Sequence, residues 1–199
     1  FFFFTSENLY KFCDIYFEAL PQIDVLGIWN NYFEDELAHR FCKDAELIPL
    51  QSLEPYYFSS PWSIELKDKN VLVIHPFEDS ILKQFAQKDK LFDDPNILPA
   101  FNLQTIKAVQ GVVHHKNDFA SWFDAFQYMR EEIDQRSFDI ALIGAGAYGL
   151  PLAAYIKRRG KQAIHMGGAL QILFGIKGSR WDAVPAISKF YNANWTRPL

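Results

Sequence analysis

The sequence predicts an α/β fold in which a mostly parallel sheet is covered by helices on both faces. Short apolar runs alternate with helix-like segments at least six times along the chain. Parallel strands that are buried on both faces give such continuous apolar runs, whereas half-exposed strands alternate polar and apolar residues. A length of 199 residues suits a single domain with a full core. We therefore expect one α/β domain over residues 1–199. Because the chain has no initiator Met, we also expect a native N-terminal segment upstream of Phe1.

The first half of the chain alternates helices and strands. Thr5 or Ser6 is expected to cap a helix that runs to about Leu20, before Pro21. Apolar runs over residues 24–29 and 46–50 predict two buried strands, which flank a helix-like segment. Residues 61–67 suit another short helix after the loop at Gln51–Ser60.

The middle of the chain contains the clearest strand, Val71–His75. Asp79 or Ser80 is expected to cap the helix that follows, with Ile81, Leu82 and Phe85 facing inward. A further strand is expected to begin at Thr105. A long apolar stripe then predicts a helix capped by Asn117 or Asp118, and its inward residues are Phe119, Trp122, Phe123, Phe126, Met129 and Ile133.

Residues 138–182 form the unit around which the rest of the chain is organised. A strand at Ile140–Ile143 leads into a glycine loop and a helix, and a second strand at Gln162–His165 leads into a second glycine turn. This Rossmann-like arrangement presents backbone N–H groups to phosphate. The candidate nucleotide- or phosphate-binding residues in the two turns are Gly144, Gly146, Tyr148, Gly149, Gly167 and Gly168.

The spacing Gly144-x-Gly146-x-x-Gly149 matches the dinucleotide fingerprint. That fingerprint also needs Asp or Glu at the end of the next strand to hold the ribose, and residues 164–167 contain no acid. The sequence therefore disfavours NAD, although Arg158 or Arg159 leaves NADP as an alternative. A tight strand-to-helix turn without a ligand also fits the glycine loop.

Four side chains near the ends of strands are candidate catalytic residues. His75 and His165 each end a predicted strand, and Glu78 and Asp79 closely follow the first of them. Such groups suit acid–base work or a divalent metal. A structural role for each histidine and a helix-terminal role for the acids also fit. No nucleophile motif supports a covalent mechanism.

Positive charge is concentrated near the C-terminus. Residues 151–199 carry eight Lys or Arg and one acid, whereas residues 1–150 carry 12 Lys or Arg and 23 acids. Lys177 and Arg180 are placed to clamp a diphosphate, and Trp181 to stack on a base. An exposed basic turn beside a buried Trp would give the same pattern.

The composition limits which class of binding partner and which cellular compartment we expect. A formal net charge of −4 argues against nucleic acid as a partner. We expect no transmembrane segment, because no uninterrupted apolar run reaches about 18 residues. Two cysteines without metal or redox spacing suit a reducing, cytoplasmic location.

Three long segments carry a resemblance to a known family. They are VLVIHPFEDSI (71–81), the whole stretch 138–182, and YNANWTRP (191–198), with shorter support from DVLGIW and LEPYYF. In these segments the chain is similar to bacterial proteins encoded in capsule and surface-polysaccharide gene clusters, which themselves resemble GT-D-type glycosyltransferases.

The resemblance implies a Rossmann-like glycosyltransferase that uses a nucleotide sugar, most often a UDP-sugar, and a glycan or lipid-linked acceptor. It also implies a divalent metal, Mn or Mg, held in part by an acidic Asp-Gly-Glu-like motif near the N-terminus. This sequence contains no Asp-Gly-Glu. Either the motif lies upstream of Phe1 or this branch lacks it.

Overall fold

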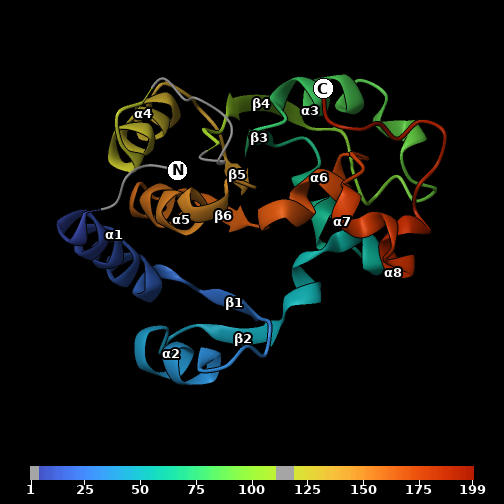
Figure 1. The fold of residues 1–199 in the computed structure, drawn as a ribbon. Helices are drawn as coiled ribbons and strands as arrows, with labels where there is room; N and C mark the ends of the chain where they lie inside the picture. Colours follow the sequence, from blue (N-terminus) through green and yellow to red (C-terminus); the bar gives the residue numbers. More distant parts are fainter. Residues whose placement is uncertain (1–4, 111–118) are drawn as a thin grey trace.

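Four parallel strands form the central sheet, in the order β4-β3-β5-β6, and the α/β class is confirmed (Figure 1). The computed structural model describes residues 5–110 and 119–199. The strands of this sheet are β3 (Asn70–His75), β4 (Asn102–Lys107), β5 (Ile140–Ile143) and β6 (Gln162–His165). The helices are α1 (Ser6–Ala19), α2 (Glu34–Phe41), α3 (Glu78–Phe85), α4 (Trp122–Asp134), α5 (Gly149–Arg158), α6 (Leu170–Leu173), α7 (Ser179–Asp182) and α8 (Pro185–Ser188).

The two central strands send alternate side chains to opposite faces of the sheet. Val71 and Leu142 belong to the core cluster on the face that carries α3 and α6. Leu72 and Ile143 belong to the cluster on the face that carries α4 and α5. This period of two places apolar residues in both layers, which is why the strands read as continuous apolar runs.

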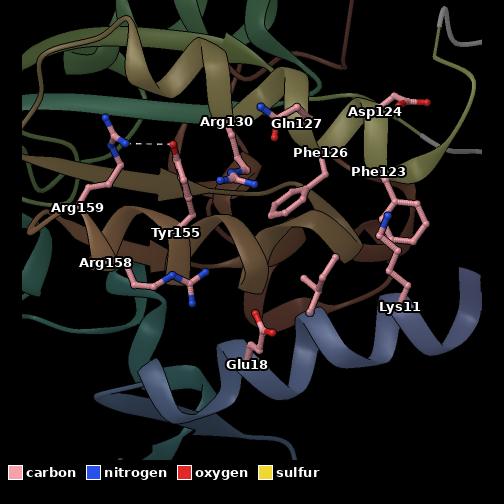
Figure 2. Close-up of a pocket in the computed structure, with 11 residues that line it drawn as sticks. Lys11, Glu18, Phe123, Asp124, Phe126, Gln127, Arg130, Tyr155, Arg158 and Arg159 are labelled. Carbon is pink, nitrogen blue, oxygen red and sulfur yellow. Dashed lines mark hydrogen bonds between the residues drawn. The ribbon is translucent and has the colours of Figure 1, made fainter.

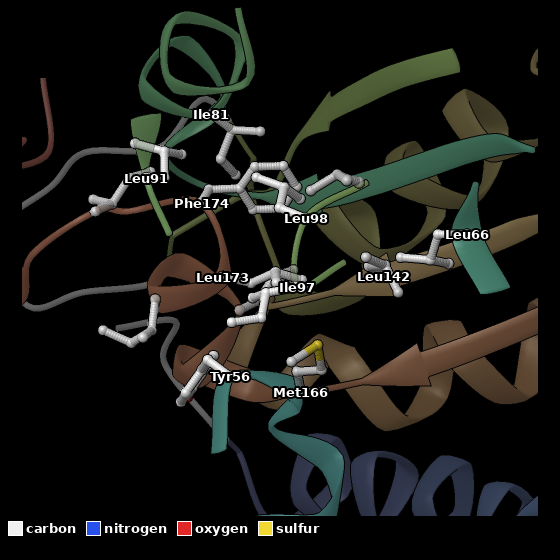
Figure 3. Close-up of a cluster of buried hydrophobic side chains, with 14 of the residues drawn as sticks. Tyr56, Leu66, Ile81, Leu91, Ile97, Leu98, Leu142, Met166, Leu173 and Phe174 are labelled. Carbon is white, nitrogen blue, oxygen red and sulfur yellow. The ribbon is translucent and has the colours of Figure 1, made fainter. Parts of the chain in front are cut away.

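Figure 3 shows the apolar side chains that are buried on the first of these faces. Phe174 packs there with Leu98 and Ile81, and Leu173 lies close to Ile97. These residues come from α3, α6 and the loop between α3 and β4, so distant segments share one core. The predicted long loop before β4 is therefore an integral part of that core.

The direction of the connections fixes which face each helix covers. The chain passes from β3 through α3 to β4 on one side of the sheet centre, and from β5 through α5 to β6 on the other side. Right-handed crossovers that run in opposite directions place their helices on opposite faces. The buried Ile81 of α3 and Leu152 of α5 accordingly lie in different core clusters.

The first two strands do not join this sheet, which corrects the expectation of one continuous sheet. β1 (Val25–Ile28) and β2 (Glu46–Pro49) pair only with each other among the described residues, in parallel. β2 is largely exposed, and in β1 only Gly27 is buried, so the expectation that both strands are buried was wrong. Figure 1 shows them with α2 below the main body of the molecule. Lys157 of α5 ties this part to the rest by donating to Gln22 O and to Asp24 Oδ1, both at 2.7 Å.

Several local expectations also needed correction. Thr5 caps α1 as predicted, with its Oγ1 accepting from Asn8 N at 3.2 Å. However, α3 begins at Glu78 without a side-chain cap, and Ser80 instead accepts a hydrogen bond from Leu199 N. Leu82 is 45% exposed rather than inward-facing. β4 begins at Asn102, three residues before the expected start.

The start of α4 is set by Ser121, whose Oγ accepts from Asp124 N at 3.1 Å. The expected caps, Asn117 and Asp118, lie outside the described residues. The segment at 61–67 forms a 3-10 helix over Trp62–Leu66 rather than an α-helix. These errors concern where an element begins, which way Leu82 faces and the type of one short helix, whereas the type and order of the main elements were predicted correctly.

Candidate functional site

The carboxyl ends of β3 and β5 meet at the point where the order of the strands reverses. In open α/β sheets, this switch point opens the crevice in which ligands bind. The His75 ring packs directly against Gly144 there, because a Cβ on Gly144 would lie 2.5 Å from His75 Cδ2. The same Cβ would lie 2.7 Å from Gly167 O. The carboxyl ends of β3, β5 and β6 therefore converge, and they bring His75, Gly144 and Gly167 together as the sequence predicted.

Both glycine turns have a backbone shape that suits an anion. Ala145 has φ −118° and ψ 25°, and Gly146 follows with φ 54°. Met166 has φ −93° and ψ −6°, and Gly167 follows with φ 58°. A right-handed residue followed by a left-handed one turns successive N–H groups toward one concavity, which is an anion-binding nest. Met166–Gly167 has this conformation, and Ala145–Gly146 approaches it with a more extended Ala145.

The two nest glycines have unpaired backbone donors. Within residues 5–110 and 119–199, the backbone N–H groups of Gly146 and Gly167 have no hydrogen-bond partner. On the Cβ side of each glycine, no heavy atom beyond the adjacent residues lies within 4 Å. Unpaired backbone N–H groups are the donors that a phosphate uses.

Arg180 extends the second turn. A Cβ on Gly168 would overlap the Arg180 guanidinium, so the absence of a side chain at Gly168 makes room for Arg180. The guanidinium carbon also lies 3.9 Å from the centroid of the Trp181 ring. Arg180 is thus held between a glycine backbone and an aromatic face, with its donors beside the turn.

A pocket of about 360 Å³ lies next to this arginine. It contains three predicted binding residues, Lys177, Arg180 and Trp181. It also contains Arg197, which sequence reasoning counted only as part of the basic tail. Arg197 reaches the pocket because Lys177 N donates to Thr196 O at 2.7 Å, and it pairs with Asp182 at 2.8 Å. Three cations in one pocket favour an anionic ligand.

His75 is a neutral, buried side chain. Its Nδ1 accepts a hydrogen bond from the Phe77 N–H at 3.0 Å, so the single proton of the neutral ring is on Nε2. Burial lowers the pKa of His75 to about 4. At neutral pH this residue is therefore a hydrogen-bond donor through Nε2 at the switch point, and it is uncharged.

His165 has the opposite tautomer. Its Nδ1 lies 3.2 Å from Ile143 O, and a carbonyl only accepts, so the proton is on Nδ1. Burial lowers the pKa of His165, while the bond to Ile143 O acts in the other direction. The ring packs against Gly149 at the start of α5, where a larger residue would overlap it. Nε2 of His165 is therefore an unprotonated acceptor.

Glu78 and Asp79 turn toward the edge strand β4. Glu78 accepts from Thr105 Oγ1 at 2.7 Å, and Asp79 lies 3.6 Å from Lys107 Nζ. Within residues 5–110 and 119–199, no group of three or more His, Cys, Asp or Glu is placed to hold a metal ion. The predicted acids and histidines therefore do not form a metal-binding group in this part of the chain, and the divalent metal that the resemblance implies stays a prediction.

A further carboxylate, Glu54, lies beside the site, in the segment between β2 and β3. Glu54 accepts a hydrogen bond from Tyr56 OH. Burial raises the pKa of Glu54, while this hydrogen bond and the nearby charge of Arg180 lower it. The motif LEPYYF contains both residues, but only the tertiary structure brings Glu54 close to Arg180.

The backbone N–H of Tyr148 is not free for a phosphate, which corrects its prediction, because it donates to Ala145 O at 3.1 Å. The Tyr148 side chain is 4% exposed and stacks on Trp122, with ring centroids 4.9 Å apart and an interplanar angle of 4°. Its hydroxyl is buried and has no partner among the described residues, and burial raises its pKa. The residue instead anchors the glycine loop to the core under α4.

Arg158 and Arg159 do not support the NADP alternative. They lie at the far end of α5 from Gly149, ten residues or about 15 Å along the helix. Arg159 pairs there with Asp134 at 3.1 Å. The glycine loop therefore lacks both the acid and the nearby arginine that a dinucleotide ribose would need.

In the part of the chain that the structure describes, no helix combines the length and the apolar character needed to cross a membrane. No family model, curated protein or solved structure matches this chain.

Proposed function

We propose that this protein binds a nucleotide sugar at the C-terminal edge of its four-stranded sheet and transfers the sugar during surface-polysaccharide biosynthesis. One observation carries the proposal: two glycine turns, with unpaired N–H groups at Gly146 and Gly167, lie at the switch point, and Arg180 packs against Gly168 of the second turn. A nucleotide sugar is held by its diphosphate, which matches donors and cations in this arrangement. A UDP-sugar is the donor that the sequence resemblance favours, and the cytoplasm is where such donors are used.

Each group near the edge has a role in this proposal. The two glycine turns hold the diphosphate, and Lys177 and Arg180 neutralise the charge that develops on the departing nucleotide. His165, with its unprotonated Nε2, is the candidate to take a proton from a hydroxyl of a glycan or lipid-linked acceptor. His75 donates through Nε2 to a substrate oxygen.

Binding is tested by thermal shift and calorimetry with UDP-, GDP- and CDP-sugars, each with and without Mn or Mg. A ligand at 100 times its Kd adds about 2.7 kcal/mol to the free energy of unfolding. Arg180→Met and Lys177→Met should each weaken binding by about tenfold or more. Lys189→Met is the matched control, since Lys189 lies over the Phe190 ring and is not part of the pocket lining. No stabilisation by any of these nucleotides would contradict the proposal.

A non-catalytic nucleotide-binding module is the second candidate. It is favoured by Glu78 and Asp79, which contact β4 and are not directed at the glycine turns. In that case a nucleotide would bind without turnover, and binding would be insensitive to His75→Ala. Release of nucleotide from the bound sugar in the presence of an acceptor, lost in His165→Asn, separates the enzyme from the module.

A further inference from the structure

A second pocket lies away from the glycine turns, on the face of the sheet that carries α4 and α5. It has a volume of about 660 Å³ and is formed by α1, α4 and α5 (Figure 2). Sites for small organic ligands have volumes of about 300–1,000 Å³. None of the residues that line it was predicted as a binding residue except Arg158 and Arg159, which entered only through the NADP alternative.

The pocket, which we call the α1–α4–α5 groove, has an excess of positive charge. Its cations are Lys11, Arg130, Arg158 and Arg159, and its acids are Glu18 and Asp124. Arg159 is already paired with Asp134, outside the lining. Asp124 accepts a hydrogen bond from Ser121 Oγ at 2.8 Å, so this carboxylate is also engaged.

Arg130 has a buried hydrogen-bond donor that is not satisfied by the described residues. Its Nε is buried and has no hydrogen-bond partner among the described residues. The guanidinium carbon lies 4.3 Å from the Tyr155 ring centroid and 5.6 Å from that of Phe126, so two aromatic rings hold it in place. No described acid forms an ion pair with it. A buried charged donor without a partner is unfavourable, and an anion would satisfy it.

The rest of the groove suits the body of a ligand that carries this anion. Ile15, Phe123 and Phe126 supply apolar surface beside the arginines. Arg158 has no ion pair or hydrogen bond among the described residues, and in Figure 2 the guanidinium groups of Arg130 and Arg158 both extend toward the space between α4 and α1. A guanidinium binds carboxylate or phosphate oxygens through paired N–H donors.

We propose that the α1–α4–α5 groove binds a small amphipathic anion, with a carboxylate or phosphate held by Arg130 and Arg158 and a ring-sized apolar body on Ile15, Phe123 and Phe126. This site is separate from the one at the glycine turns. The ligand can act on those turns from a distance, since α1 also holds the first of them through Tyr16 OH, which donates to Ala147 O at 2.6 Å.

The test is calorimetric titration of the 199-residue chain with phenyl phosphate and with benzoate, which distinguish the two headgroups. Inorganic phosphate lacks the apolar body and benzyl alcohol lacks the charge, so both should bind at least about tenfold more weakly. Arg130→Met should reduce the affinity for the better aromatic anion by about tenfold or more. Arg136→Met is the matched control, because Arg136 pairs with Glu132 at 2.9 Å outside the groove, and it should change the affinity by less than about twofold.

A melting measurement and one further variant keep the test decisive. Arg130→Met should melt at the same temperature as the parent chain or higher when no ligand is present, because it removes an unpaired buried donor. If it does not fold, Arg158→Met should still weaken binding by about threefold or more. The proposal is overturned if neither aromatic anion binds, if both groove variants bind as tightly as the parent, or if Arg180→Met abolishes binding while Arg130→Met does not.

Discussion

The strands of the four-stranded sheet and of the two-stranded sheet are both mainly apolar, but they differ in how deeply they are buried. Leu142 of β5 is 0% exposed, whereas Leu47 of β2 is 49% exposed, although both lie in short apolar strands. β5 lies in a sheet that has helices on both faces. β2 has one neighbouring strand, β1, and most of its residues are exposed. Apolar character thus predicts a strand, but only the packing partners determine how much stability that strand provides.

The largest expected effect contrasts these two leucines. Leu142→Ala should lower the free energy of unfolding by about 3 kcal/mol, through lost burial and the cavity left behind. Leu47→Ala should lower it by less than about 1 kcal/mol, because that side chain is half in water already. Urea denaturation measures both. Equal losses would mean that β2 is as deeply buried as β5.

A pH titration examines the buried end of the central sheet. Burial lowers the pKa of His75 from 6.5 to about 4, so the unfolded chain binds a proton that the folded chain does not. The free energy of unfolding should therefore be independent of this group above pH 6.5 and fall as the pH drops from there toward 4. The full loss is about 3 kcal/mol. His75→Asn should flatten this part of the pH profile, and an unchanged profile would show that another group is responsible.

Replacing one glycine by alanine in each region compares how well the two regions tolerate an added methyl group. Gly144→Ala would place its Cβ 2.7 Å from the backbone oxygen of Gly167 and should cost about 2 kcal/mol. Gly27→Ala in β1 meets first the flexible end of Leu53, at 2.9 Å, and then Leu50 Cα at 3.1 Å, so it should cost about half as much. Chemical denaturation of both variants checks the order, and a reversed order would place the tighter packing in the small sheet.

The smallest effect concerns the contact between the two regions. Lys157→Met removes the 2.7 Å ion pair with Asp24, which is partly exposed and screened by solvent. The expected change in the global free energy of unfolding is below about 1 kcal/mol. Hydrogen exchange should nevertheless speed up in β1 and leave β3 unchanged. Faster exchange in both strands would show that the two sheets unfold as one unit.

Much of the site could be predicted from the sequence because it is local. The turns around Gly146 and Gly167 need a left-handed backbone, which glycine adopts without strain. The glycine residues in the sequence therefore identified both turns directly. His75 and His165 were identified because each ends a strand. The prediction for Tyr148 was wrong because its backbone N–H pairs within the turn, with Ala145 O, while its ring stacks on Trp122 in the core.

The sequence by itself determined the type and order of the main elements, the glycine turns and histidines at the strand ends, and the basic character of the C-terminal region. These follow from periodicity, glycine conformation and charge, all of which are properties of neighbouring residues. Only the tertiary structure decided that β1 and β2 lie outside the main sheet, that Glu78 and Asp79 face β4, and that Arg130 has no acidic partner among the described residues. Those outcomes depend on contacts between segments far apart in the chain, which local patterns do not encode.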